Sequence, residues 1–178
     1  VWNYSIMNMV EDYFNISDKI AVITGTSRGI GYALAKGFLQ AGAVVHGLSR
    51  SGSDLSNRKN YIDHKVDLKD RESISDLIND ISKSQVNLDI LINCAGISIP
   101  INKNSNVFDN YFQKNLDINL LSSFNLSYAV AEIMKKHNSG SIINVTSIGA
   151  HLGFPSNPAY IASKAGLAGL TRSLSYDF

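Results

Sequence analysis

Residues 19–31, "KIAVITGTSRGIG", decide the fold. The first half is a short apolar run rich in β-branched side chains that stops at Gly25, which predicts a buried strand. Apolar residues from Ile30 to Ala41 then recur at helical spacing, and Gly42 ends that helix. The stretch therefore predicts a strand, a glycine-rich turn and a helix in direct succession.

The same alternation continues along the chain. The sequence predicts four further strands, "AVVHGLS", "YIDHKVDL", "LDILINCAG" and "GSIINVTS". It also predicts three further helices: one over Ile74–Ile81 with Asp70 as N-cap, one from about Phe108 to His137 after a loop over Ser98–Asn106, and one from Pro158 onward. Because the strands are apolar and amphipathic helices separate them, we expect a parallel sheet covered on both faces. The expected fold class is a single-domain, doubly wound α/β (Rossmann) fold.

Composition limits the classes of function. The chain has 178 residues, 44 % of them hydrophobic, and a net charge of +1, which gives no reason to expect nucleic acid or an acidic membrane as partner. No apolar run is long enough to span a bilayer, and the start lacks both a signal peptide and an initiating Met. Cys94 is the only cysteine, which fits a reducing compartment, so we expect a cytoplasmic protein.

The turn "TGTSRGIG", Thr24–Gly31, lies where doubly wound folds bind ligands, beyond the carboxyl ends of the strands. Gly25 permits a tight turn, Gly29 lets the backbone approach a pyrophosphate, and Gly31 lets the helix pack closely on the strand. The helix that begins there directs N–H groups and a partial positive charge towards phosphates. A simple connecting turn is the alternative, but the strand–turn–helix setting favours a phosphate cradle.

The spacing G-x-x-x-G-x-G resembles that of the short-chain dehydrogenases/reductases, and other motifs of this family follow in order. "NCAG", Asn93–Gly96, resembles the family's turn after the fourth strand, and Asn119 in "LDINLL" matches its helix asparagine. Ser147 lies thirteen residues before Tyr160, and Tyr160-x-x-x-Lys164 resembles the family's signature pair. Each match alone is weak, but the set in register is specific.

The resemblance implies the chemistry of a secondary alcohol and a ketone. Tyr160 would exchange a proton with the substrate oxygen, and Ser147 would polarise the same group. Lys164 stands four residues after Tyr160, on the same helix face, where its ammonium would stabilise a phenolate and bind the nicotinamide ribose. Asn119 would anchor a water that links the lysine to solvent. Taken singly, each of the four has a bland alternative as a cap, a surface charge or a packed polar residue.

The end of the second strand predicts the cofactor. Ser49 stands where NAD-binding proteins of this fold carry an acid, and Arg50 follows it. With Arg28 in the glycine turn, they favour NADP(H) over NAD(H), although both arginines could be solvated surface residues. Asp67 resembles the family's aspartate near the adenine. The full set of expected cofactor contacts is Gly25, Ser27, Arg28, Gly29, Ile30, Gly31, Ser49, Arg50, Asp67, Leu68, Asn93, Ala95, Gly96, Tyr160 and Lys164.

Family members continue beyond the tyrosine helix with further strands and a substrate loop. We therefore expect residues 1–16 to form an N-terminal extension and residues 17–178 a C-terminally truncated NAD(P)-binding domain. The full-length form would be a homo-oligomer, a dimer or tetramer, that acts on a small carbonyl or alcohol like a 3-oxoacyl reductase or a sugar or polyol dehydrogenase. The alternatives are a fragment that binds a nucleotide or a partner without turnover, and an epimerase or dehydratase of the extended branch, whose G-x-x-G-x-x-G differs from this turn.

No metal site is expected. His46, His64 and His137 are scattered along the sequence, and His151, which lies between Ser147 and Tyr160, could at most touch the substrate.

Overall fold

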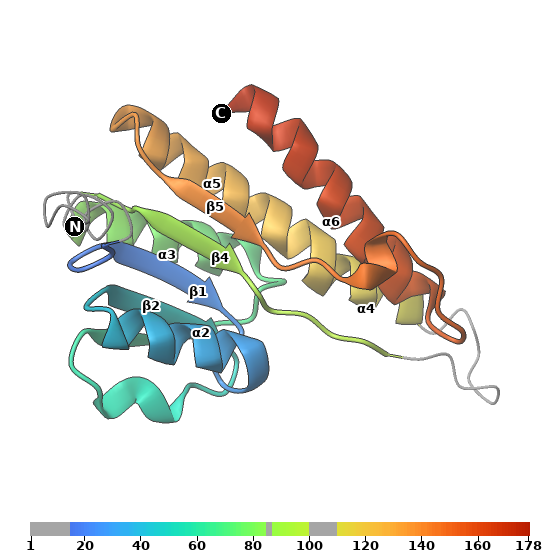
Figure 1. Cartoon of the computed structure of the whole chain (residues 1–178), viewed down its shortest axis with the longest axis horizontal. Coiled ribbons are helices and arrows are strands. Elements are labelled where there is room, and N and C mark those ends of the chain that lie inside the picture. The colour runs from blue at the N-terminus through green and yellow to red at the C-terminus, as the bar shows by residue number, and fades with distance from the viewer. Residues whose placement is uncertain (1–14, 85–86, 100–109) are drawn as a thin grey trace, which may run out of the picture.

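The computed structural model describes residues 15–84, 87–99 and 110–178. Within them, five parallel strands form one sheet in the order β3-β2-β1-β4-β5 (Figure 1), which confirms the doubly wound α/β fold. The strands are β1 (Ile20–Thr24), β2 (Val44–Ser49), β3 (Tyr61–Lys65), β4 (Ile90–Asn93) and β5 (Ser141–Asn144). The reversal of strand order between β1 and β4 opens the crevice in which such sheets bind ligands.

The helices agree with the periodicity of the sequence. They are α2 (Gly29–Gln40), α3 (Arg71–Ser84), α4 (Tyr111–Leu116), α5 (Ser122–Lys136) and α6 (Pro158–Asp177). The predicted cap of α3 is confirmed, because Asp70 Oδ1 accepts a hydrogen bond from the backbone N–H of Ser73 at 3.1 Å. None of the helices in the described ranges has the length and apolar character needed to cross a bilayer.

Short irregular elements are the main difference from the prediction. The helix expected over residues 108–137 contains a π-helical turn, η2 (Asp117–Leu121), between α4 and α5. Ser122 Oγ donates to the carbonyl of Ile118 at 2.7 Å there, a side-chain bond that competes with the regular backbone ladder. Two 3₁₀ turns, η1 (Asp54–Asn57) and η3 (Ile148–Ala150), were not predicted either. Most of the expected extension over residues 1–16 and of the loop over Ser98–Asn106 lies outside the described residues.

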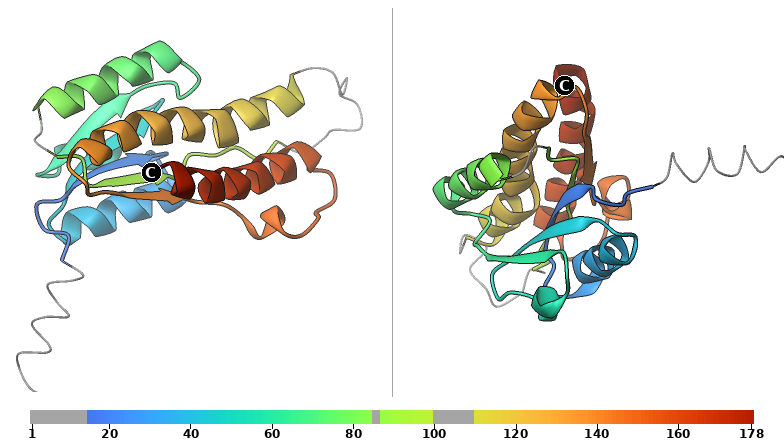
Figure 2. Two further views of the ribbon diagram at one scale, coloured as in Figure 1. Left: turned by 90° about the horizontal axis from the view of Figure 1, so that it is seen from above. Right: turned by 90° about the vertical axis from the view of Figure 1, so that its left-hand side faces the viewer.

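Two apolar cores separate the layers. On one face α2 covers a cluster that contains Ile23, Val45 and Tyr61. On the other face α3 and α5 cover a cluster that contains Val22 and Leu91, and α6 runs beside α5 along β5 (Figure 2). β5 is at the edge of the sheet in the described residues, and Ile143 is 45 % exposed on it.

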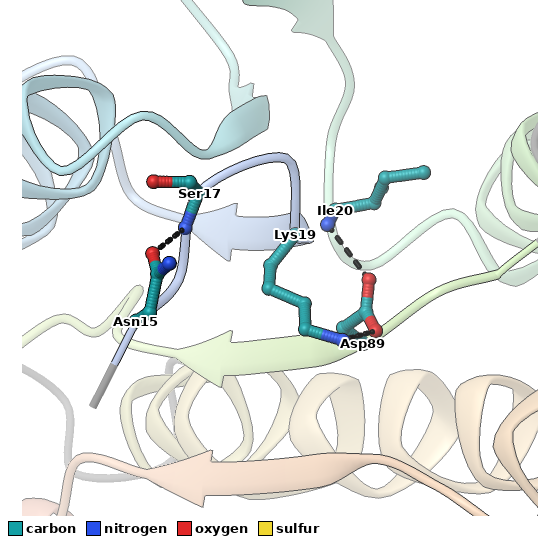
Figure 3. A network of polar contacts seen from close by, with 5 residues as sticks. All are labelled: Asn15, Ser17, Lys19, Ile20 and Asp89. Carbon is teal, nitrogen blue, oxygen red and sulfur yellow. Dashed lines mark hydrogen bonds and ion pairs between the residues drawn. The ribbon is translucent and has the colours of Figure 1, made fainter. Parts of the chain in front are cut away.

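The amino ends of the central strands are joined by one carboxylate. Asp89 precedes β4, and its Oδ2 accepts from the backbone N–H of Ile20 at 2.9 Å while its Oδ1 pairs with Lys19 Nζ at 3.0 Å (Figure 3). The backbone N–H of Asp89 donates to the carbonyl of Ile20, and that of Ser141 donates to the carbonyl of Asp89. Asp89 thus fixes the register of β1, β4 and β5 at the end of the sheet opposite the glycine turn.

The structure brings together two histidines that are far apart in the sequence. His46 of β2 and His64 of β3 stack with nearly parallel rings, and His46 Nδ1 lies 2.9 Å from His64 Nε2. The expectation that the histidines are scattered is therefore wrong for this pair, because neighbouring parallel strands place both side chains on one face. In the described residues no group of three or more His, Cys, Asp or Glu side chains could hold a metal ion.

We predict that this pair makes the fold sensitive to acid. Burial, reinforced by the neighbouring His64, lowers the pKa of His46 from 6.5 to about 4. Between these two pH values His46 is protonated in the unfolded chain but not in the folded chain. The free energy of unfolding therefore falls as the pH decreases, by about 3 kcal/mol over the whole window. Urea unfolding at about pH 7 and about pH 4.5 measures this loss. His46→Asn should reduce it, whereas the same change at the exposed His137 should not; equal losses in the two variants would contradict the assignment.

Candidate active site

The glycine-rich turn leaves an open cradle between β1 and α2. Gly25 and Gly29 have φ angles of 78° and 63°, a backbone conformation that glycine adopts without strain. A side chain on Gly31 would meet the carbonyl groups of Gly25 and Thr24, so α2 packs closer to β1 than a larger residue would allow. Arg28, the N-cap residue, is extended and caps no amide of this 12-residue helix with its side chain. The cradle therefore fits the pyrophosphate of a dinucleotide.

A buried hydroxyl joins this turn to the turn that follows β4. Thr24 Oγ1 accepts hydrogen bonds from the backbone N–H groups of Cys94 at 3.0 Å and Ala95 at 2.9 Å. Thr24 is 1 % exposed, and a Cβ on Gly25 would lie 2.9 Å from Ala95 Cα. The two motifs "TGTSRGIG" and "NCAG" thus lie side by side, as parts of one site require.

Lys164 is the buried cation of the site. It lies on α6, is 4 % exposed, and its Nζ donates to the carbonyl of Val145 at 2.7 Å, just beyond β5. Burial lowers the pKa of Lys164, and the neighbouring Cys94 thiol opposes that shift. The backbone at the end of β5 therefore fixes the position of the Lys164 ammonium.

Asn119 lies in the π-helical turn and joins that turn to two other segments. Its Oδ1 accepts from the N–H of Ile97 at 2.8 Å, and its Nδ2 donates to the carbonyl of Ile97 at 2.8 Å and to Ser163 Oγ at 2.9 Å. Both amide protons and one lone pair are thus engaged within the protein. The role of Asn119 in anchoring a water stays a prediction. The water would have to bind to the backbone of Asn119, because its side-chain amide is engaged within the protein.

Gly96 separates Asn119 from Lys164. A Cβ on Gly96 would lie 3.3 Å from Asn119 Oδ1 and 3.6 Å from Lys164 Nζ. The fold therefore brings together three residues that the sequence analysis singled out, Gly96, Asn119 and Lys164. The first and the last are 68 positions apart in the sequence.

Ser147 and Tyr160 lie on the two sides of the connection from β5 to α6. Ser147 caps η3, where its Oγ accepts from the N–H of Gly149 at 3.0 Å. Tyr160 is half-buried in the first turn of α6, one helical turn before Lys164. The connection is tied to the segment after β4, because Asn157 Nδ2 donates to Ser98 Oγ at 2.6 Å. His151 is exposed at the end of η3.

The residues expected to bind the adenosine part of the cofactor differ in exposure and in hydrogen bonding. Ser49 is 6 % exposed, and its Oγ has no hydrogen-bond partner in the described residues. Arg50 and Arg28 are exposed. Asp67 accepts from the N–H of Lys69 at 3.1 Å, and the side chain of Leu68 is buried in the core beneath α3. Leu68 could therefore contact a cofactor only through its backbone.

The side chain of Asn93 is directed into the protein. It is 2 % exposed, and its Nδ2 donates to Ser127 Oγ at 3.0 Å and to Asn144 Oδ1 at 2.8 Å. Asn144 Nδ2 donates in turn to Thr171 Oγ1 at 2.9 Å. This network joins β4, β5, α5 and α6, so a contact of Asn93 with a cofactor is left to its backbone.

Two positioning residues were missed in the sequence. Thr24 is a hydroxyl at the end of an apolar strand, and Ser163 follows Tyr160 by three positions and is fully buried. A small polar residue at a position that the pattern assigns to the core is a signal of a hydrogen-bonding role, but the partner cannot be read from it.

Comparison with known proteins gives consistent matches. Residues 19–178 match the family described as short chain dehydrogenase. The 3alpha-hydroxysteroid dehydrogenase of Mediterraneibacter gnavus is 38 % identical over 179 residues, which cover 93 % of this chain and 70 % of that protein. A short-chain dehydrogenase from Streptomyces avermitilis superposes with a TM-score of 0.84 at 27 % identity, over 90 % of this chain and 61 % of that one. A 4-hydroxyisoleucine dehydrogenase in complex with NADH superposes with a TM-score of 0.76 at 34 % identity, over 90 % and 69 % of the two chains.

We predict that two glycines of α2 respond in opposite ways to the same substitution. Gly31→Ala should destabilise the fold by about 1–3 kcal/mol and displace the turn, because the new methyl group meets backbone carbonyls that cannot move freely. Gly37→Ala, in the same helix with nothing within 4 Å, should stabilise by about 0.5–1 kcal/mol. Urea unfolding measures both, and a neutral Gly31→Ala would show that the turn is looser than described.

Proposed function

This chain belongs to the short-chain dehydrogenase family, as the match over residues 19–178 shows, and we propose that it is an NADP-dependent oxidoreductase that interconverts a secondary alcohol and a ketone. The family supplies the general reaction, hydride transfer between a nicotinamide cofactor and a CH–OH group. The chain spans 61 % to 70 % of the length of the three relatives described above, so the activity proposed is that of the whole protein.

The observation that carries the proposal is the buried lysine. The Lys164 ammonium is held against the carbonyl of Val145, one helical turn from the half-buried Tyr160, and no carboxylate of the described residues lies within 4.0 Å of it. Burying a cation costs free energy, so a chain retains one where the charge has a use. A positive charge close to a phenol stabilises the phenolate, which favours proton transfer between a tyrosine and a substrate oxygen.

The proposed roles follow from this arrangement. During reduction Tyr160 donates its phenolic proton to the carbonyl oxygen of the substrate, and the Ser147 hydroxyl donates a hydrogen bond to the same oxygen. Lys164 stabilises the phenolate that remains. Ser163 and Asn119 hold the first turn of α6 against the π-helical turn. The nicotinamide, when bound, supplies the hydride, and oxidation of the alcohol reverses these proton movements.

The preference for NADP rests on the residues at the end of β2. The buried Ser49 hydroxyl has no partner in the described residues, and Arg50 follows it at the surface. A carboxylate at Ser49 would repel a 2′-phosphate, whereas a hydroxyl beside a guanidinium binds one with charge-assisted hydrogen bonds. One of the relatives was solved with NADH, so the choice of cofactor depends on this chain's own residues and not on the family.

The names of the relatives suggest a class of substrate. One relative is named for a hydroxysteroid and another for 4-hydroxyisoleucine, and both substrates carry a hydroxyl group. We infer a secondary alcohol or its ketone, with a 3-oxoacyl compound or a polyol among the candidates. A cytoplasmic location also stays a prediction, based on the single cysteine.

An exposed aromatic pair on α5 supports the proposed homo-oligomer. Phe124 and Tyr128 are 36 % and 48 % exposed, and the centroids of their rings lie 5.8 Å apart. Aromatic side chains of this kind are enriched at protein interfaces. We therefore propose that α5 contacts a second copy of the chain.

The oligomer should depend on this aromatic pair. We expect the full-length protein to be at least a dimer by light scattering at micromolar concentration. Tyr128→Glu should shift it towards the monomer with unchanged circular dichroism, because a buried unpaired carboxylate opposes association. A monomeric wild-type protein would refute the proposal.

The proton-transfer role is tested at one atom. Tyr160→Phe in the full-length protein should bind NADPH with wild-type affinity but lose turnover by at least about a hundredfold, because only the hydroxyl is removed. Fluorescence titration measures the first and a spectrophotometric assay with small ketones the second. A Tyr160→Phe protein with near wild-type turnover would remove Tyr160 from the mechanism.

The cofactor preference is tested by charge reversal. The wild-type protein should bind NADPH more tightly than NADH, and Arg50→Asp should abolish or invert the ratio of the two dissociation constants. Fluorescence titration with both cofactors gives the ratio. Equal affinity of the wild type for both would overturn the NADP assignment.

A further inference from the structure

A third cation lies beside the proposed NADP site. Lys65 is the last residue of β3, and the parallel register pairs it with Ser49, the last residue of β2. Residues paired in this way present their side chains on the same face of a sheet. The buried, unpartnered hydroxyl of Ser49 and the side chain of Lys65 are therefore neighbours at the carboxyl edge, on the face that α2 covers.

The loop after β2 is built around the stem of this lysine. Gly52 has a φ of 78°, and a Cβ on it would lie 2.7 Å from Lys65 Cε. A larger residue at this position would thus displace the stem as well as strain the backbone. The loop that carries Arg50 therefore passes directly over Lys65, and the two cations belong to one surface.

The charges around Lys65 leave its ammonium available. No carboxylate of the described residues lies within 4.0 Å of it. Asp63, two residues earlier on the same face, accepts a hydrogen bond from the Tyr61 hydroxyl at 3.4 Å and would also lie 2.7 Å from a Cβ on Gly52. Without Lys65, the nearest charge to the buried Ser49 on β3 would be this carboxylate, which repels a phosphate.

The geometry points to Lys65 as a residue that determines cofactor specificity: its ammonium binds the 2′-phosphate of NADP together with Ser49 and Arg50. This inference rests on the proposed function and extends it to a residue on β3. Three groups then contribute: a donor hydroxyl at the base, a planar guanidinium in the loop and a mobile ammonium from the neighbouring strand. The lysine also screens the phosphate from Asp63.

The test compares two lysines of the same segment in the full-length protein. Lys65→Met keeps an unbranched side chain of similar length and removes the charge, and Lys59→Met makes the same change at an exposed position before β3. Dissociation constants for NADPH and NADH are measured by fluorescence titration, and those for adenosine 2′-monophosphate and adenosine 5′-monophosphate by displacement. Unfolding curves in urea verify that the variants are folded.

We expect Lys65→Met to weaken NADPH and adenosine 2′-monophosphate by about tenfold and to leave NADH and adenosine 5′-monophosphate within about twofold. Lys65→Arg should retain the affinity for NADPH, and Lys59→Met should behave as the wild type. The loss caused by Lys65→Met should shrink at high ionic strength, because it is electrostatic.

The other outcomes separate this inference from the proposed function. If the wild type prefers NADPH and Lys65→Met preserves that preference, the role of Lys65 is wrong and the proposed NADP site stands. An equal loss for all four ligands would make Lys65 a structural residue and overturn the inference. If the wild type binds NADH as tightly as NADPH, the NADP assignment itself fails and the role of Lys65 fails with it.

Discussion

The site depends on one buried hydroxyl. Thr24 Oγ1 accepts hydrogen bonds from two backbone N–H groups of the turn after β4. The end of β1 and the segment that begins at Cys94 therefore cannot move independently. From that segment Ile97 binds Asn119, and Asn119 binds Ser163 on the same helix as Lys164. Each step is a hydrogen bond made by the buried side chain of Thr24 or Asn119, for which an unmade bond is costly. The glycine turn and α6 are thereby held in a fixed relation to each other.

The two halves of the sheet carry different kinds of functional group. The ends of β1, β2 and β3 carry the glycine turn, the unpartnered serine and the cations, which are suited to phosphates. The ends of β4 and β5 lead to Ser147, Tyr160 and Lys164, which are suited to proton transfer. The two sets adjoin where β1 pairs with β4, the place at which strand order reverses. Groups suited to phosphate binding and groups suited to proton transfer thus follow different strands.

The sequence was sufficient for the features that depend on local pattern. Strand and helix positions and the cap at Asp70 follow from periodicity and residue type, and the structure agrees with them. The resemblance of the motifs to a known family is confirmed by the match over residues 19–178. It was not sufficient for contacts between distant residues. The direction of the Asn93 side chain, the stacking of His46 on His64 and the partners of Asn119 depend on strand register, which is a tertiary property. The π-helical turn was missed because its residues have ordinary helical spacing.

One contact near the phosphate site links positions that no local pattern connects. The Tyr61 hydroxyl lies 2.9 Å from Thr26 Oγ1, within hydrogen-bond distance, and occupies the space that a side chain on Gly47 would fill. The Tyr61 side chain of β3 thus fills the space left by the missing side chain of Gly47 on β2. We therefore expect these three positions to vary together, because a larger residue at Gly47 would displace the Tyr61 hydroxyl and Thr26 would lose its hydrogen-bond partner. Covariation among the three would be the record of this fit in the genomes of related proteins.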